Sequence, residues 1–466
     1  MGISVPARML LWSTRNGAMN EKRPDERWTR RSMLAGLGGA AAGGVAFAAP
    51  TAGPHESSAR SRRQVAQRLL DAVPEAGAWV ELDRLAVAAN LAAVRRRAGG
   101  RPVMGVVKAN AYGHGLAPMA RMLADAGVAA LMVITVDEAL AVRAAGIRTP
   151  VLNYGPYDRP AAAKLIEQDV DQAVYTREAV EGLAAAARGT GKAARVHLVL
   201  DTGLGRVGVP AAGAAEVFEA AASGVAAGTL QVGGIATALT EDLEYDRVQL
   251  ARFEAARERA RAAGLDAGTR HVASSAAVLD FPEAHLDMVR PGIMLYGHYP
   301  NDRSRAERPI ELAPVLSLKA RIAYVKTLAA SDSIGYHRAW IAERATTVAT
   351  LPIGHSQGYP ARALAAGGWV EIQGRACPLI GGITSDHLEV AIPDGLEVRV
   401  GDIATLIAGA PGTARPGAGA TAGGARVADA GESQIPPTAP LVGEWDGAGV
   451  YGVLMHLSPL LPRMIR

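Results

Sequence analysis

Eight short runs rich in apolar and β-branched residues recur between residues 102 and 293, and alanine-rich stretches separate them. The runs are PVMGVVK, ALMVIT, PVLNYG, DQAVYT, RVHLVLD, QVGGIAT, RHVASS and DMVRPGI. Strands that alternate with helices pair in parallel, and eight of them can close into a barrel. We therefore predict an α/β fold, a (β/α)8 TIM-type barrel over residues 76–305, whose functional face lies at the carboxyl ends of the strands.

Beyond residue 306 the pattern changes to strands and turns without long helices between them. The strand-like runs are VLSLKARIAYVKTL, TTVATLPIG, WVEIQGRACPLIGGIT and LEVRVGDIATLIA. They predict a second, mostly β domain over residues 306–466. Within it, residues 408–440 are rich in Gly, Ala, Pro and Thr and lack periodicity, so we expect a low-complexity insertion there.

The first 48 residues have the features of a twin-arginine-type signal peptide. Arg30 and Arg31 precede a weakly apolar Gly/Ala-rich run, and 46–48 (AFA) offer a small-residue cleavage site. The apolar run is too short for a stable membrane span. We therefore expect export to the periplasm or the extracellular space, with residues 49–75 as a linker behind the signal.

Charge and cysteine content exclude several classes of function. The net charge is +4, and the leader's seven basic and three acidic residues account for all of it, so the remainder is neutral. A neutral body gives no reason to expect nucleic-acid binding. Cys377 is the only cysteine, which excludes an intramolecular disulfide and a cysteine-rich zinc site. We expect no metal.

Lys108 lies where the first predicted barrel strand ends. A buried ammonium there must be paired, reach the surface or take part in chemistry, and the residue type alone does not decide among these. The flanking segment VMGVVKANAYGHG resembles the pyridoxal-phosphate attachment segment of the alanine racemases. Four further segments resemble family motifs in the same order: DTGLGRVGV, HVASSAAVLDFP, MVRPGIMLYG and LPIGHSQGYP.

The resemblance covers about residues 78–463 and implies a barrel followed by a β domain, a pyridoxal 5'-phosphate cofactor, and interconversion of L- and D-alanine or of other small neutral amino acids. It makes Lys108 the lysine that binds the cofactor as a Schiff base, a role that an amine with a lowered pKa suits. The positions that hold the cofactor phosphate in the family correspond to Tyr112, Ser275, Gly292, Ile293 and Tyr451.

The resemblance also assigns the proton-transfer and substrate groups. Arg290 corresponds to the arginine that donates to the pyridine nitrogen, which leaves that nitrogen unprotonated and disfavours side reactions. Tyr336 corresponds to a second catalytic base that comes from the other subunit, because a racemase needs a proton-transfer group on each face of the Cα. A homodimer with shared active sites is therefore implied. Arg206 and Ser385 correspond to substrate-binding positions.

Several family positions are not kept. Val199 stands where a carbamylated lysine usually orients the arginine corresponding to Arg206, so we expect another acceptor or a bound anion to hold a buried Arg206. Ala238 replaces a histidine, and Ser385 stands where a methionine is common, while Asp386 is kept. A roomier, more polar substrate end would admit amino acids larger than alanine.

Three alternatives remain open at this stage. A decarboxylase or an aldolase can use the same architecture, because fold alone does not fix the reaction. The departures also fit a homologue that binds the cofactor but turns over slowly. A cofactor-binding protein without catalytic activity shares the barrel and the lysine, but such proteins lack the β domain expected here.

Overall fold

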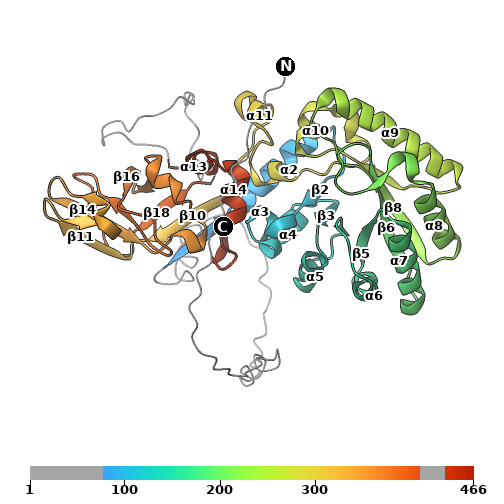
Figure 1. Cartoon of the computed structure of the whole chain (residues 1–466), viewed down its shortest axis with the longest axis horizontal. Coiled ribbons are helices and arrows are strands. Elements are labelled where there is room, and N and C mark those ends of the chain that lie inside the picture. Colours follow the sequence, from blue (N-terminus) through green and yellow to red (C-terminus); the bar gives the residue numbers. More distant parts are fainter. Residues whose placement is uncertain (1–76, 410–435) are drawn as a thin grey trace, which may run out of the picture. The chain divides into compact units, whose positions relative to one another are not determined.

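The computed structural model describes residues 77–409 and 436–466 (Figure 1). The predicted signal peptide, the linker and most of the low-complexity insertion lie outside the described residues.

A closed barrel of parallel strands forms the first part of the described chain. Seven strands pair in chain order, namely β2 (Met104–Val106), β3 (Ala130–Val133), β4 (Val151–Asn153), β5 (Val170–Val174), β6 (Ala194–Asp201), β8 (Leu230–Ala236) and β9 (Thr269–His271). Residues 288–290 close the ring, because Met104 N donates to Val289 O at 2.9 Å and Arg290 N donates to Ala273 O at 2.8 Å. Seven of the eight predicted strands are thereby confirmed, and the eighth, DMVRPGI, contributes a single β-bridge at Val289 instead of a regular strand.

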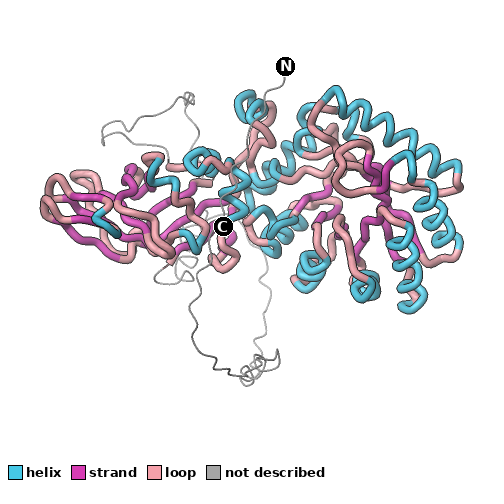
Figure 2. The backbone as a smooth tube through the Cα atoms, in the orientation of Figure 1, coloured by secondary structure: helices cyan, strands magenta, loops and turns pink. Residues whose placement is uncertain are grey.

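Helices follow the barrel strands and lie on their outer side (Figure 2). The longer ones are α2 (Arg84–Arg97), which precedes β2, and then α4 (Leu116–Asp125), α5 (Val136–Ala144), α6 (Arg159–Glu167), α7 (Arg177–Thr190), α8 (Ala215–Ala226) and α9 (Leu243–Ala262). Side-chain caps define where several begin: Asp83, Thr135 and Thr176 accept backbone N–H groups of α2, α5 and α7. None of the helices in the described ranges is long and apolar enough to cross a bilayer.

A nine-stranded sheet forms the β domain. Its order is β11 (Tyr324–Leu328), β14 (Thr346–Leu351), β17 (Leu388–Ala391), β16 (Arg375–Ile380), β15 (Trp369–Ile372), β18 (Ile403–Ile407), β10 (Leu316–Arg321), β1 (Ala78–Leu82) and β19 (Arg463–Ile465). β1 precedes the barrel in the chain but pairs with β10 and β19. The segment expected to form the barrel, residues 76–305, therefore begins with a strand of the other domain.

Two C-terminal helices follow the insertion, α13 (Ala439–Asp446) and α14 (Gly449–His456). The predicted run LEVRVGDIATLIA is a strand only over β18, while β17 was not predicted. A separate two-stranded ribbon, β12 (Ser333–Ile334) and β13 (Trp340–Ile341), brackets Tyr336.

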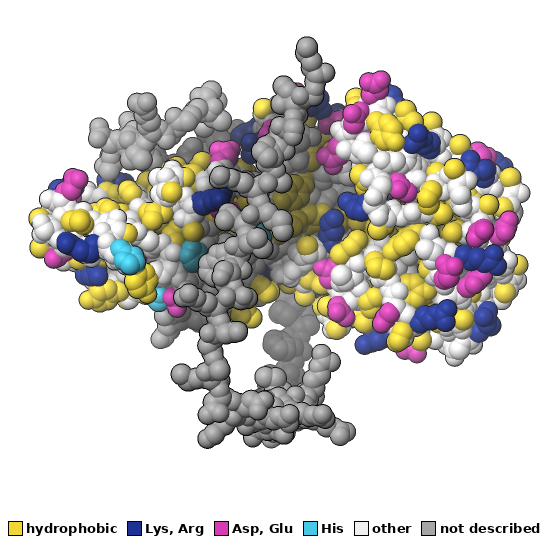
Figure 3. Space-filling model, viewed as in Figure 1, with side chains coloured by type: hydrophobic (Ala, Val, Ile, Leu, Met, Phe, Trp, Pro, Cys, Tyr) yellow, Lys and Arg dark blue, Asp and Glu magenta, His cyan; other side chains and the backbone are white. Residues whose placement is uncertain are grey.

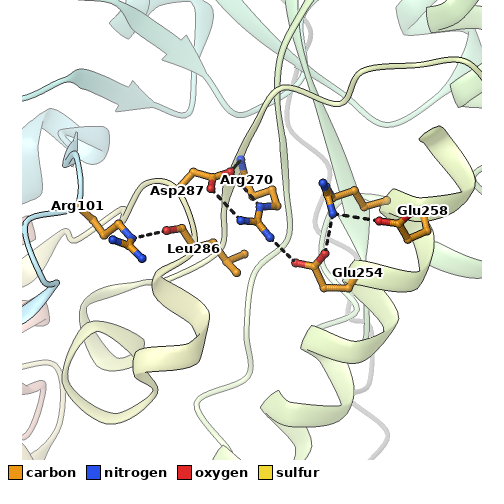
Figure 4. Close-up of polar contacts among 7 residues, drawn as sticks. Arg101, Glu254, Glu258, Arg270, Leu286 and Asp287 are labelled. Atoms are coloured by element: carbon orange, nitrogen blue, oxygen red, sulfur yellow. Dashed lines mark hydrogen bonds and ion pairs between the residues drawn. The ribbon is translucent and has the colours of Figure 1, made fainter.

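Charged side chains connect β9 with α9 away from the strand ends that carry Lys108 (Figure 4). Arg270 on β9 pairs with Asp287 at 2.9 Å and with Glu254 at 3.3 Å. Arg101 donates to Leu286 O at 2.6 Å. These contacts hold the segment that leads to the closing strand. Elsewhere on the barrel face in view, acidic and basic side chains are interspersed rather than gathered by sign (Figure 3).

Candidate active site

Lys108 lines a cavity of about 490 Å³ at the carboxyl ends of the barrel strands. This volume lies within the usual range for small-molecule sites. Burial lowers the pKa of Lys108, nearby Arg206 lowers it further, and Glu138 opposes the shift. A larger share of the amine is therefore unprotonated near neutral pH, which makes Lys108 a better nucleophile and proton acceptor.

The chain turns left-handed directly after Lys108. Four consecutive non-glycine residues, 109–112, have φ between 52° and 54°. Such a conformation costs about 1–2 kcal/mol per residue, so the surroundings must enforce it. Glu138 Oε1 accepts from Asn110 N at 3.2 Å, and Asn110 Oδ1 accepts from Leu116 N at 2.9 Å. These bonds fix the turn that presents Lys108 and Tyr112 to one cavity.

Tyr112, Ser275, Gly292 and Tyr451 form a cradle of neutral donors, which we call the anion cradle together with Ile293. Ser275 Oγ accepts from Gly292 N at 3.0 Å. The Tyr112 and Tyr451 rings lie 6.1 Å apart. Burial raises the pKa of Tyr112 well above its usual range and that of Tyr451 to about 12, so both hydroxyls stay protonated. Hydroxyl and backbone N–H groups of this kind can hold a phosphate dianion.

The absence of a side chain at Gly292 keeps the anion cradle open. A Cβ built there would lie 2.4 Å from Tyr112 Oη, which is too close for any real contact. The residues present therefore fit a phosphate-bearing cofactor: a reactive lysine, neutral phosphate donors and space between them.

Arg290 enters the same cavity and is held by a chain of histidines. It donates to His271 Nδ1 at 2.9 Å and to Thr237 O at 2.7 Å. His271 Nε2 lies 2.8 Å from His197 Nδ1, and His197 Nε2 lies 3.2 Å from Asp171 Oδ2. Because Arg290 can only donate, His271 Nδ1 accepts, and each imidazole passes its remaining N–H toward Asp171.

This direction of donation fits two neutral imidazoles. The pKa of His271 lies well below its usual value because of burial and the charge of Arg290. Arg290 is therefore fixed as a donor at the barrel centre.

Arg206 lines the cavity but, contrary to our expectation, it is not buried. Its side chain is exposed at the rim and makes no hydrogen bond or ion pair with any other residue that the structure describes. The prediction that an acceptor or anion must compensate a buried guanidinium was wrong in its premise, because the loop after β6 leaves Arg206 in solvent. Val199 is fully buried within β6, and Ala238 lines the cavity.

Tyr336 and Ser385 lie away from the Lys108 cavity of their own chain. They share a second hollow, of about 420 Å³, with Asp386 and His355 in the β domain. The Tyr336 side chain is 82% exposed. Within one chain the structure thus brings together Lys108, Arg206, Arg290 and the anion cradle, and it gathers Tyr336 and Ser385 elsewhere.

Sequence reasoning missed Tyr154 and Glu241, which line the cavity, and Glu138, which is not part of the lining but acts electrostatically on Lys108. Tyr154 lies near the end of the predicted strand PVLNYG, so the rule that selected Lys108 could have found it. Glu138 lies in the first turn of α5, where an acidic side chain is expected because it stabilises the helix. The sequence therefore gives no sign that Glu138 also contacts the turn after Lys108. Glu241 belongs to an irregular loop without periodicity.

Among the described residues, no cluster of three or more His, Cys, Asp or Glu side chains could hold a metal ion.

Fold and site together define a barrel enzyme with an appended β domain, in which a reactive lysine shares a cavity with an anion cradle. Residues 82–300 match the family model described as the N-terminal domain of alanine racemase, and residues 315–427 match that of its C-terminal domain. The chain belongs to the alanine racemase family.

Individual relatives agree with this assignment. The alanine racemase of Symbiobacterium thermophilum is 39% identical over 322 residues, which cover 68% of this chain and 84% of that protein. The crystal structure of alanine racemase from D-cycloserine-producing Streptomyces lavendulae has a TM-score of 0.73 at 32% identity and covers 84% of this chain and 97% of that one. The histidine racemase of Leuconostoc mesenteroides has a TM-score of 0.70 at 28% identity, with 84% and 99% covered.

Proposed function

We propose that this protein is a pyridoxal 5'-phosphate-dependent alanine racemase, which interconverts L- and D-alanine. One observation carries the proposal: a lysine with a lowered pKa, an anion cradle and a buried arginine donor share one cavity at the strand ends. Relatives with the name alanine racemase support the same activity.

Each cavity residue then has a defined task. Lys108 would hold the cofactor, and its amine would take or give the proton at one face of the substrate Cα. The anion cradle would bind the phosphate group, and Arg290 would donate to the ring nitrogen and keep its own proton. The bound cofactor supplies the electron sink for negative charge at the Cα.

A second proton-transfer group must serve the opposite face of the Cα, and we assign it to Tyr336. Its exposure and its distance from the Lys108 cavity of its own chain support a shared site in a homodimer, in which Tyr336 and Ser385 of one protomer reach the Lys108 cavity of the other.

A complementation experiment tests the shared site. Lys108→Ala and Tyr336→Phe homodimers should each be nearly inactive. When equal amounts exchange subunits, about a quarter of all sites regain both residues. Activity that stays at the level of the separate variants, although mass spectrometry detects mixed dimers, contradicts a shared site.

The substrate range extends beyond alanine in this proposal. Ala238 and Ser385 are small side chains at positions where the family has larger ones. A similar solved structure is named a histidine racemase, and histidine is a larger amino acid than alanine. Chiral chromatography after incubation with each L-amino acid gives the range. Lys108→Ala is the matched control. Release of carbon dioxide or of an aldehyde without D-amino acid would instead favour a decarboxylase or an aldolase.

Export through the twin-arginine route is also part of the proposal, on the basis of Arg30 and Arg31 ahead of the apolar run. Replacement of both by lysine should retain the folded protein in the cytoplasm, as measured by cell fractionation. Unchanged export of this variant would contradict the route.

A further inference from the structure

The hydroxyl group of Tyr154 is buried in the Lys108 cavity without a partner. Tyr154 follows β4 and is 3% exposed. It lines the cavity, and its Oη makes no hydrogen bond. A buried hydroxyl without a partner costs free energy, so the position is favourable only if a ligand supplies an acceptor.

The surroundings of Tyr154 favour an electron-rich ligand atom. The Arg290 guanidinium lies over its ring, with the guanidinium carbon 5.5 Å from the ring centroid. Arg206, which lines the same cavity, also acts electrostatically on Tyr154. Burial raises the pKa of Tyr154, so its hydroxyl remains a donor. A donor that two guanidinium groups influence suits an acceptor that carries negative charge.

The strand order indicates which ligand atom this is. Four of the five residues of the anion cradle come from the turn after β2, the segment after β9 and the closing strand, which are neighbours in the barrel, and Tyr451 comes from α14. Tyr154 follows β4 and Arg206 follows β6, on the other side of the mouth. In pyridoxal phosphate, the phosphate arm and the ring oxygen flank the carbon that bonds to lysine, one on each side. With the phosphate in the anion cradle and that carbon at Lys108, the ring oxygen would lie on the side of the cavity that Tyr154 lines.

We propose that Tyr154 Oη donates a hydrogen bond to the ring oxygen of pyridoxal phosphate, which makes Tyr154 a cofactor-binding residue of this chain. The inference rests on the proposed function. In this proposal the contact with Arg290 also positions the Tyr154 hydroxyl, because the ring that carries the hydroxyl packs against the guanidinium group.

The test is Tyr154→Phe, which keeps the ring on Arg290 and removes only the hydroxyl. Cofactor-free protein is titrated with pyridoxal phosphate and followed by absorbance. Affinity should fall about 5- to 10-fold, the usual effect of one neutral hydrogen bond. The pH midpoint of the bound cofactor's absorption change should rise, because a donor to the ring oxygen favours its anionic form. The melting temperature of the cofactor-free protein should not fall, since the hydroxyl bonds no protein atom.

Tyr157→Phe is the matched control, because the Tyr157 hydroxyl donates to Ala179 O at 2.5 Å and lies outside the cavity. It should change neither cofactor affinity nor the spectrum. A second comparison uses the cofactor analogue that lacks the ring oxygen, which wild type and Tyr154→Phe should bind equally.

Two results would overturn the proposal. One is a Tyr154→Phe variant with wild-type affinity and spectrum. The other is unchanged cofactor binding with a raised KM, which would assign the hydroxyl to the substrate. Failure of the proposed function is distinguishable, because wild type itself would then bind no pyridoxal phosphate at Lys108.

Discussion

Replacement of Gly292 by alanine tests the anion cradle most sharply. The new Cβ would lie 2.4 Å from Tyr112 Oη, whereas ordinary contact begins at 3.4 Å, so the two must separate by about 1 Å. Tyr112 has little freedom to move, because its ring packs against Tyr296 at 5.0 Å between centroids. Overpacking of this kind costs about 1–3 kcal/mol of folding stability.

The larger effect should fall on the cofactor. A displaced Tyr112 hydroxyl loses a bond to a charged phosphate, worth about 1.5–3 kcal/mol, so affinity for pyridoxal phosphate should drop about 10- to 100-fold. Absorbance titration of the cofactor-free protein measures this, and a thermal melt measures stability. Gly189→Ala is the control, since nothing lies within 4 Å of its Cβ position. If Gly292→Ala folds and binds the cofactor as tightly as wild type, the phosphate is not held in this cradle.

Two further predictions concern pH. Because the pKa of Lys108 is lowered, the folded cofactor-free protein binds fewer protons than the unfolded chain between that pKa and 10.5. Lys108→Met should therefore raise the melting temperature at pH 7. The gain should shrink as the pH approaches 10.5. A gain that is constant with pH would contradict this sign. The pKa of Asp287 is lowered by its hydrogen bond from Arg270, so its contribution is present above 3.8 and is lost as pH falls through the folded value. Asp287→Asn should therefore cost less than about 1 kcal/mol at pH 7, because the pair is partly exposed, and nothing in strong acid, as urea unfolding can show.

The barrel and the Lys108 cavity could be predicted because both follow from local patterns. Each strand carries its own apolar run, and a parallel barrel brings all the strand ends to one face, so Lys108, Arg290 and Ser275 meet without further information. Tyr154 obeys the same rule, although its role depends on an unpaired hydroxyl that only coordinates reveal.

The rest depends on contacts distant in sequence. β1 pairs with β10, more than 200 residues away, and five apolar-rich residues do not specify that partner. The exposure of Arg206 depends on how the loop after β6 leaves the barrel. The role that we propose for Tyr336 requires a second copy of the chain, because within one chain Tyr336 lies outside the Lys108 cavity.

The two-base mechanism is tested most directly by incubating Tyr336→Phe with L-alanine and with D-alanine in deuterated water. Binding of both should survive, because the variant removes a single hydroxyl and leaves Lys108, Arg290 and the anion cradle unchanged. Racemisation should fall about 10²- to 10⁴-fold in both directions, since each needs one group to remove the proton and the other to return it. Lys108 should still place deuterium at the Cα of one enantiomer with retained configuration, and little should enter the other. Racemisation at the wild-type rate would contradict the assignment of Tyr336 as the second base.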